Sequence, residues 1–304
     1  MRILCKLLVF VYLSGYCCLY RVFIIKLLQM KNEETVDKNI GSAEQLTVET
    51  AIANLQQKTD LGARYYAAWW LGKFRVRESA AIEALLIALE DESDRAPDGG
   101  YPLRRNSARA LGKLGDMRAV TPLIRCLKFP DFYVREAAAQ ALENLGDRKC
   151  VSTLIEMLQG GVEAAQFVPG KPHLVEPYEA VIEALGTLGA TEATSSIEPF
   201  IEHPVAKVKY AAARAMYQLT LEDRYGNILI GALSGDDLQL RRSALMDLAA
   251  VGYLPAGEAI AETLAENSMK LIALKGLLET NLQKDTLALS EENIRIMNLM
   301  DDLL

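Results

Sequence analysis

One phrase recurs along most of this 304-residue chain, and an internal repeat constrains the fold more than any other sequence feature. Its clearest copies are LRRNSARALGKLGD (103–116) and VREAAAQALENLGD (134–147). With Leu71 as the reference, the equivalent residues are Leu111, Leu142, Leu185, Met216, Leu248 and Leu277. Their spacings of 29 to 43 residues predict a stack of similar units, two of which carry insertions.

Each unit contains two amphipathic segments. An apolar segment such as AVTPLIRCLK (119–128) precedes each phrase, and its apolar residues recur at helical spacing. The LGD or LGA that ends a phrase places Gly where a left-handed helix C-cap is expected. Strand patterns are absent from the sequence. We therefore predict an all-α fold, an α-solenoid of helical-hairpin repeats over residues 46–280.

The two insertions are EDESDRAPDGGYP (90–102) and QGGVEAAQFVPGKPHLVEP (159–177). Their Gly and Pro content predicts loops rather than extra helices. Inserted loops on one edge of a solenoid often bind ligands, but neutral surface decoration is equally compatible with this pattern.

The two ends differ from the repeats. Residues 1–29 contain one uncharged run, 7–20, which is shorter than the roughly 20 residues of a membrane-spanning helix. This stretch is either a signal or anchor segment, or translated sequence upstream of a true start at Met30. We predict that residues 1–45 form an N-terminal extension outside the fold and that residues 281–304 form a C-terminal helical tail.

Charge and cysteine content exclude several classes of function. Four basic residues lie within 1–29, and the rest of the chain has 29 basic against 40 acidic residues. Such an acidic body disfavours nucleic-acid binding. Cys126 and Cys150 have neither a CxxC partner nor a neighbouring His, so we predict free buried thiols in a reducing compartment and no metal site.

Several segments together resemble one family. They are YYAAWWLGKF (65–74), GGYPLRRN (99–106), DFYVREAAAQALE (131–143), GGVEAAQ (160–166), PHLVEPYEA (172–180), HPVAKVKYAAARA (203–215) and GDDLQLRRSAL (235–245). The chain resembles the HEAT-like repeat proteins of the phycobilisome lyase group, and specifically the E-type subunits of phycocyanin α-subunit phycocyanobilin lyases. The resemblance runs from about Leu46 to Leu278, and YYAAWWL is its most discriminating motif.

This resemblance implies a subunit that is active with a homologous F-type partner. The pair binds phycocyanobilin as substrate and adds a cysteine thiol of the apo-phycocyanin α subunit across the ethylidene group of the pigment's A ring. It implies no cofactor, no metal and no membrane span, and a cytoplasmic location in a cyanobacterium or the stroma of a plastid. Two alternatives remain open: a non-catalytic adaptor in pigment detachment or phycobilisome degradation, and a lyase subunit for another phycobiliprotein.

Comparison of the repeats suggests which residues face outward. The position of Trp69 is occupied elsewhere by Arg109, Gln140, Glu183, Arg214, Met246 and Lys275. Because most of these are polar, we expect Trp69 and Tyr65, four residues earlier, to stack on one exposed helix face. Such a strip needs a cover, which could be the pigment, the partner subunit or the N-terminal segment. Trp70, with Tyr66 beneath it, stands where four other repeats have Ala.

Bilins also carry two propionates, for which Arg is the natural bidentate partner. A basic row runs along the repeats: Arg64, Arg104, Arg135, Lys209, Arg241 and Lys270, with Tyr178 in the fourth repeat. Such a row either packs repeats together or binds pigment. Arg104 and its neighbour Arg105, beside the first insertion, are the better pigment candidates. The predicted bilin- or partner-binding residues are Tyr65, Tyr66, Trp69, Trp70, Arg104 and Arg105.

No nucleophile and base stand together in the sequence, so the catalytic residues stay unassigned. Because positioning alone can supply much of the rate, we expect a binding and orienting role, with an Asp, Glu or Tyr as the acid.

Overall fold

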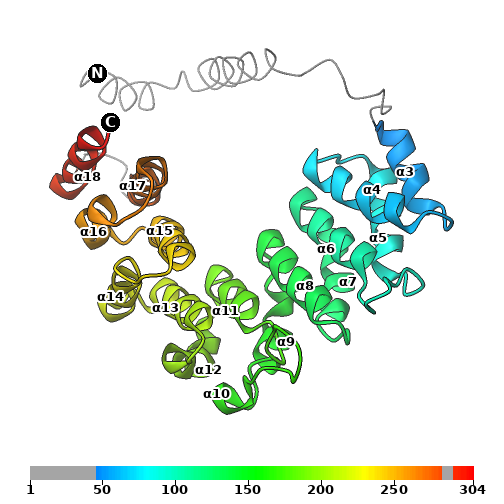
Figure 1. The fold of residues 1–304 in the computed structure, drawn as a ribbon, viewed down its shortest axis with the longest axis horizontal. Helices are drawn as coiled ribbons and strands as arrows, with labels where there is room; N and C mark the ends of the chain where they lie inside the picture. Colours follow the sequence, from blue (N-terminus) through cyan, green and yellow to red (C-terminus); the bar gives the residue numbers. More distant parts are fainter. Residues whose placement is uncertain (1–45, 283–289) are drawn as a thin grey trace.

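The computed structural model describes residues 46–282 and 290–304. Their helices alternate between an outer and an inner layer (Figure 1). The outer helices are α3 (Val48–Gln56), α5 (Ser79–Glu90), α7 (Val120–Cys126), α9 (Val151–Glu156), α12 (Thr194–Ile197), α14 (Asp223–Ala232) and α16 (Gly257–Glu262). The inner helices are α4 (Leu61–Lys73), α6 (Pro102–Leu114), α8 (Phe132–Leu145), α11 (Tyr178–Thr187), α13 (Ala206–Thr220), α15 (Leu238–Val251) and α17 (Asn267–Leu282).

The inner helices line the concave side of an arc, and successive inner helices contact one another along it (Figure 1). Short 3₁₀ turns lead into several outer helices: η1 (Met117–Ala119), η2 (Arg148–Cys150), η3 (Thr191–Ala193) and η5 (Leu254–Ala256), while η4 (Glu198–Glu202) extends α12. The described residues contain no strand, only one isolated bridge between Phe167 and Leu174. The predicted all-α solenoid is confirmed.

The LGD sequence ends one helix and starts the next. Gly115 and Gly146 adopt the left-handed conformation at the ends of α6 and α8, with φ of 75° and 73°. Each following aspartate, Asp116 and Asp147, accepts a hydrogen bond from the backbone N–H two residues later and caps the 3₁₀ turn. The predicted glycine cap is therefore correct, and the aspartate explains why the connection is so short.

Small residues bring neighbouring inner helices into backbone contact. A Cβ atom at Gly112 of α6 would lie 2.6 Å from the Cα atom of Ala141 in α8. The same small-residue contact joins α4 to α6, α11 to α13 and α15 to α17, through the pairs Gly72–Ala110, Gly186–Ala215 and Gly276–Ala249. The A-L-G of the repeated phrase is thus a packing element.

The basic row mainly anchors loops and helix ends. Arg64 is buried, its Nη2 lies 2.7 Å from Asp91 and its Nη1 3.3 Å from Asp94, both in the first insertion. Arg135 holds the second insertion in the same way, through the carbonyl of Val175 at 2.7 Å and Glu176 at 2.8 Å. This row therefore packs the repeats and fixes both insertions.

The second insertion departs from the loop predicted for it. It contains a one-turn helix, α10 (Gly161–Ala164), as well as the Phe167–Leu174 bridge. His203 secures this segment, since its Nε2 lies 3.1 Å from the carbonyl of Ala165. Apolar Val162, partly buried, gives the turn a core contact that Gly and Pro counts do not reveal.

At the C-terminal end, α18 (Glu291–Asp302) packs on α16 and α17 and buries Ile296 completely. The predicted N-terminal extension, residues 1–45, lies outside the described residues. Among those that are described, no helix combines the length and apolar character needed to cross a membrane.

Candidate functional site on the concave surface

The inner helix of the first repeat carries the aromatic strip. Asp60 caps α4, since its carboxylate accepts from the N–H of Ala63. Tyr65 and Trp69 are 41% and 43% exposed, as expected for outward positions, and Tyr66, which was expected beneath Trp70, is 49% exposed. The stacking partner of Trp69 is Tyr66, with ring centroids 5.4 Å apart, and not Tyr65. Residues three apart are helix neighbours as well as residues four apart, and here the shorter spacing prevails.

Trp70 is half-buried and packs against the core and the ring of Phe74, whose centroid is 4.8 Å away. In the described part of the chain no inner helix precedes α4, so the slot that Ala fills in later repeats has room for an indole. The segment proposed as a possible cover, residues 1–45, lies outside the described residues.

The two arginines beside the first insertion occupy different environments. Arg104 is 4% exposed, with its guanidinium carbon 4.1 Å from the ring centroid of Phe129 and Nη2 3.5 Å from Glu92. It occupies the same packing row as Arg64. Arg105 is half-buried in the row of Tyr65, and its guanidinium lies 5.9 Å from the ring of Tyr133. Arg105 is therefore the more accessible of the two predicted propionate ligands.

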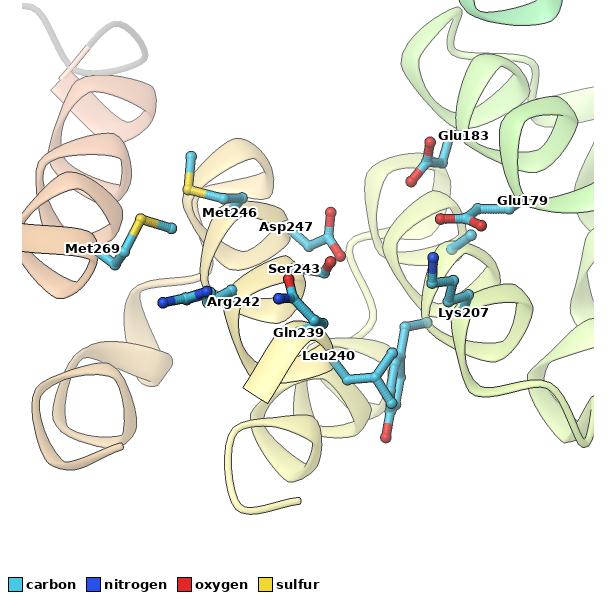
Figure 2. Close-up of a pocket in the computed structure, with 12 residues that line it drawn as sticks. Glu179, Glu183, Lys207, Gln239, Leu240, Arg242, Ser243, Met246, Asp247 and Met269 are labelled. Atoms are coloured by element: carbon cyan, nitrogen blue, oxygen red, sulfur yellow. The ribbon is translucent and has the colours of Figure 1, made fainter. Parts of the chain in front are cut away.

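A pocket of about 300 Å³ opens further along the concave surface, between α11, α13, α15 and α17 (Figure 2). Glu179 and Glu183 project from one wall, and Asp247 projects from the wall that faces them. Met246 and Met269 lie at the far end. The remaining lining residues are Lys207, Tyr210, Ala211, Gln239, Leu240, Arg242 and Ser243.

Arg214 of α13 is the common partner of three carboxylates from three different helices. Its guanidinium nitrogens lie 3.2 Å from Asp247, 3.6 Å from Glu183 and 3.9 Å from Glu143. Glu143 also accepts a 2.7 Å hydrogen bond from the hydroxyl of Thr187. One cation cannot neutralise three anions, so this cluster carries surplus negative charge when every carboxyl group is ionised.

The pKa values reflect that surplus. Burial raises the pKa of Glu183 to about 7, and the charges of Asp247, Glu179 and Glu143 add to this effect, while Arg214 opposes it. Burial likewise raises the pKa of Asp247 to about 6. It also raises the pKa of Glu179, against the influence of Lys207. At pH 7 Glu183 is therefore about half protonated, whereas an ordinary glutamate would be almost fully ionised.

Sequence comparison did not single out this cluster, although two signals for it exist. Asp247 stands one residue before Leu248, where four other repeats have Ala. Glu143 stands one residue after Leu142, where three other repeats have Gly. These two positions belong to the α13–α15 and α8–α11 contacts, which lack a Gly–Ala pair and are less extensive than their neighbours.

Other candidate nucleophiles and bases serve the fold. Cys126 and Cys150 are free and buried, and burial raises the pKa of both thiols to about 11. This confirms their prediction as core residues. Nδ1 of His203 accepts from the N–H of Val205, so its proton lies on Nε2, which donates to Ala165. His173 stacks on Phe132, with centroids 4.2 Å apart.

The described residues contain no group of three potential ligands that could hold a metal ion. The chemistry that this surface offers is therefore aromatic stacking, cationic anchoring and proton exchange with buried carboxyl groups.

Fold and site together define a HEAT-like α-solenoid whose concave surface has an aromatic end and an acidic pocket. Two family descriptions match the chain: "HEAT repeats" over residues 95–165 and "PBS lyase HEAT-like repeat" over residues 63–91. Both matches fall on the repeats identified from the internal alignment.

Curated relatives are more specific. The chain is 62% identical to phycocyanobilin lyase subunit alpha of Picosynechococcus sp. over 86% of its own length and 98% of the relative. It is 64% identical to the protein of that name from Nostoc sp., over 86% of its own length and 95% of the relative. The chain belongs to the family of phycocyanobilin lyase alpha subunits.

A solved structure agrees with this placement. One chain in the complex of CpcE and CpcF of phycocyanin lyase from Nostoc sp. is 62% identical to this chain. It superposes with a TM-score of 0.80, covering 89% of this chain and all of that one.

Proposed function

We propose that this chain is the E-type, or alpha, subunit of a heterodimeric bilin lyase. With an F-type subunit it attaches phycocyanobilin to a cysteine of the phycocyanin α subunit. The observation that carries this proposal is the identity of 62–64% with phycocyanobilin lyase alpha subunits across nearly their whole length. The bilin biosynthesis protein PecE of Nostoc sp. is 42% identical, which favours phycocyanobilin attachment over a related bilin reaction.

The partner subunit follows from the solved complex, in which a close relative of this chain is paired with CpcF. A crescent with one open concave face suits such a pairing, because it can enclose a pigment only when a second protein covers it. The lyase would act in the cytoplasm of a cyanobacterium or in the stroma of a plastid.

The reaction is a net addition with no change of oxidation state. The cysteine sulfur bonds to the exocyclic carbon of the ethylidene group, the carbon–carbon double bond is lost, and a proton ends on the adjacent ring carbon. The protein must hold an extended apolar pigment, anchor its propionates, and supply that proton. Phycocyanobilin is thus a substrate, and the addition itself requires no cofactor.

Tyr65, Tyr66, Trp69 and Trp70 suit the apolar pigment or the partner subunit because their rings form a largely exposed aromatic surface. Arg105, in the same row as Tyr65 on the next inner helix, suits a propionate. Arg104 would reach a ligand only by leaving its place between Glu92 and Phe129.

Reconstitution tests the proposal. The full chain and residues 30–304 would each be co-expressed with an F-type subunit, apo-phycocyanin α and a source of phycocyanobilin, omitting one component at a time. Covalent pigment would be detected as zinc-enhanced fluorescence on a denaturing gel. Pigmented α subunit that requires both lyase chains is the expected result. A folded complex with the partner that never yields an adduct would instead favour a lyase for another phycobiliprotein, and the absence of any complex would favour the adaptor function.

A further inference from the structure

Glu183 is placed to exchange a proton with a molecule in the acidic pocket. Its carboxyl group makes no hydrogen bond within the described residues, and its nearest cation, Nη1 of Arg214, is 3.6 Å away. Asp247 is nine-tenths buried, and only its Oδ1 has a partner, Arg214 at 3.2 Å. Its Oδ2 has none among the residues described. Two carboxyl groups thus face the cavity with unused hydrogen-bonding capacity (Figure 2).

The surroundings of Glu183 favour its protonated form. The charged groups that act on Glu183 are Glu179 on its own helix, Glu143 on α8, Arg214 on α13 and Asp247 on α15. Lys207 on α13 and Arg242 on α15 line the same pocket. Of the cations, only Arg214 pairs directly with Glu183, and Arg242 is itself paired with Glu266. Acids therefore outnumber bases, and Glu183 keeps its proton to a higher pH than an ordinary glutamate does.

Stability does not explain why these acids are there. At the position of Asp247 four other repeats bury Ala, which contacts Gly on the preceding helix in three of them. A buried carboxylate in that slot carries a desolvation cost that Ala lacks. The α13–α15 contact is less extensive than its neighbours, and Asp247 lines the pocket beside it. A costly buried charge that lines a cavity indicates a ligand.

The pocket fits the edge of a bilin. Met246 and Met269 supply a flexible apolar end to the pocket, and the carboxyl groups of Glu179 and Glu183 lie at the opposite end. An open-chain tetrapyrrole has the same mixture, with apolar substituents along its edges and polar nitrogen and oxygen atoms between them. A metal ion fits less well, since no group of three ligands suited to a metal exists in the described residues.

We propose that Glu183 is the acid that gives the pigment its proton during thioether formation, and that Arg214 and Asp247 position its carboxyl group. This inference rests on the proposed lyase function. As the cysteine thiolate bonds to the exocyclic carbon, the electron pair of the double bond takes the proton of Glu183 onto the adjacent ring carbon. The thiol has already released its own proton to solvent, and solvent reprotonates Glu183, so no oxidant or reductant enters.

The test uses the heterodimer of the full chain with the F-type subunit, apo-phycocyanin α and phycocyanobilin. Single-turnover rates of adduct formation are followed by absorbance between pH 5.5 and 9. The wild type is compared with Glu183→Gln, Asp247→Asn and the control Glu83→Gln, whose side chain lies on the outer layer and is well exposed. Titration of the acceptor thiol is common to all four proteins, so differences between profiles report on the lyase.

At pH 6.5 we expect Glu183→Gln to slow transfer by about 10²-fold or more, with pigment affinity changed less than about threefold. The decline in wild-type rate above neutral pH should be missing from this variant. Asp247→Asn should move the decline to lower pH, because it removes a negative charge that helps Glu183 to keep its proton. Glu83→Gln should match the wild type.

A Glu183→Gln heterodimer with the wild-type rate and profile would overturn the proposal. If this variant does not assemble with its partner, the Asp247→Asn variant provides the test. A pH profile of its transfer rate that matches the wild type would contradict the assignment of Glu183 as the acid. Failure of the wild-type heterodimer to transfer pigment would overturn the lyase function itself, and this inference with it.

Discussion

Replacing Gly112 by Ala should destabilise the solenoid, although Ala is the better helix former. In an isolated helix the substitution would stabilise by about 1 kcal/mol. Here the new Cβ would lie 2.6 Å from the Cα and 2.8 Å from the Cβ of Ala141. Both atoms belong to or adjoin the backbone, so no side-chain rotation relieves the clash, and overpacking of this kind costs about 1–3 kcal/mol. The cost should exceed the gain, leaving a net loss of up to about 2 kcal/mol.

Gly231 provides the matched control. It lies in α14, and a Cβ added there would have no atom within 4 Å, so Gly231→Ala should gain about 0.5–1 kcal/mol. Urea denaturation midpoints and melting temperatures of the full chain would be compared for both variants. The melting temperature should fall by roughly 2–6 °C for Gly112→Ala and rise slightly for Gly231→Ala. If Gly112→Ala stabilised as much as Gly231→Ala, direct backbone contact between inner helices would be refuted.

The pH dependence of stability should reveal Glu183. Its folded pKa of about 7 is above the ordinary 4.5, so stability is fully present below about pH 4.5 and is lost as pH rises through 7, by on the order of 3 kcal/mol. Glu183→Gln should therefore become progressively more stable than the wild type between pH 4.5 and 8, and parallel urea-midpoint profiles would contradict this. Asp237 accepts from the N–H groups of Gln239 and Leu240 at the start of α15, so Asp237→Ala should cost about 1 kcal/mol in the same assay, and no loss would argue against the cap. Tyr65→Ala combined with Trp69→Ala should abolish pigment transfer in the reconstituted system while circular dichroism keeps its helical signal, and unchanged transfer by the folded variant would remove the aromatic surface from the site.

The architecture could be predicted because its causes are local and repeated. The buried faces and the C-caps of the helices follow from residues within one repeat, and the repeat period follows from the recurrence of the phrase ending in LGD. Two predictions were wrong in detail: the stacking partner of Trp69, and the absence of a helix at 161–164. Both features depend on which of several neighbouring side chains make contact, and the sequence pattern does not distinguish among them.

The acidic pocket is a different case, because its residues come from four separate helices. The internal alignment places Glu183 and Arg214 at equivalent positions of successive repeats, but no spacing in the sequence brings all four of Glu143, Glu183, Arg214 and Asp247 together. Only the stacking of inner helices does so, and the surplus charge that raises the pKa of Glu183 is a property of that stack. The sequence did not reveal the burial of Arg104 for a similar reason. Its partners lie outside its own helix, Glu92 in the first insertion and Phe129 after α7.

Departures from the repeat pattern nevertheless point to the functional residues. A position that is Ala or Gly in most repeats serves close helix packing, so a large or charged residue there gives up packing for something else. Trp70, Glu143 and Asp247 are such departures, and each lies on an inner helix, at the aromatic end or in the acidic cluster. Tyr217 is a fourth, and its ring packs edge-on against that of Tyr253. In a solenoid the regular positions build the scaffold, and the exceptions to that regularity are therefore the first places to look for its chemistry.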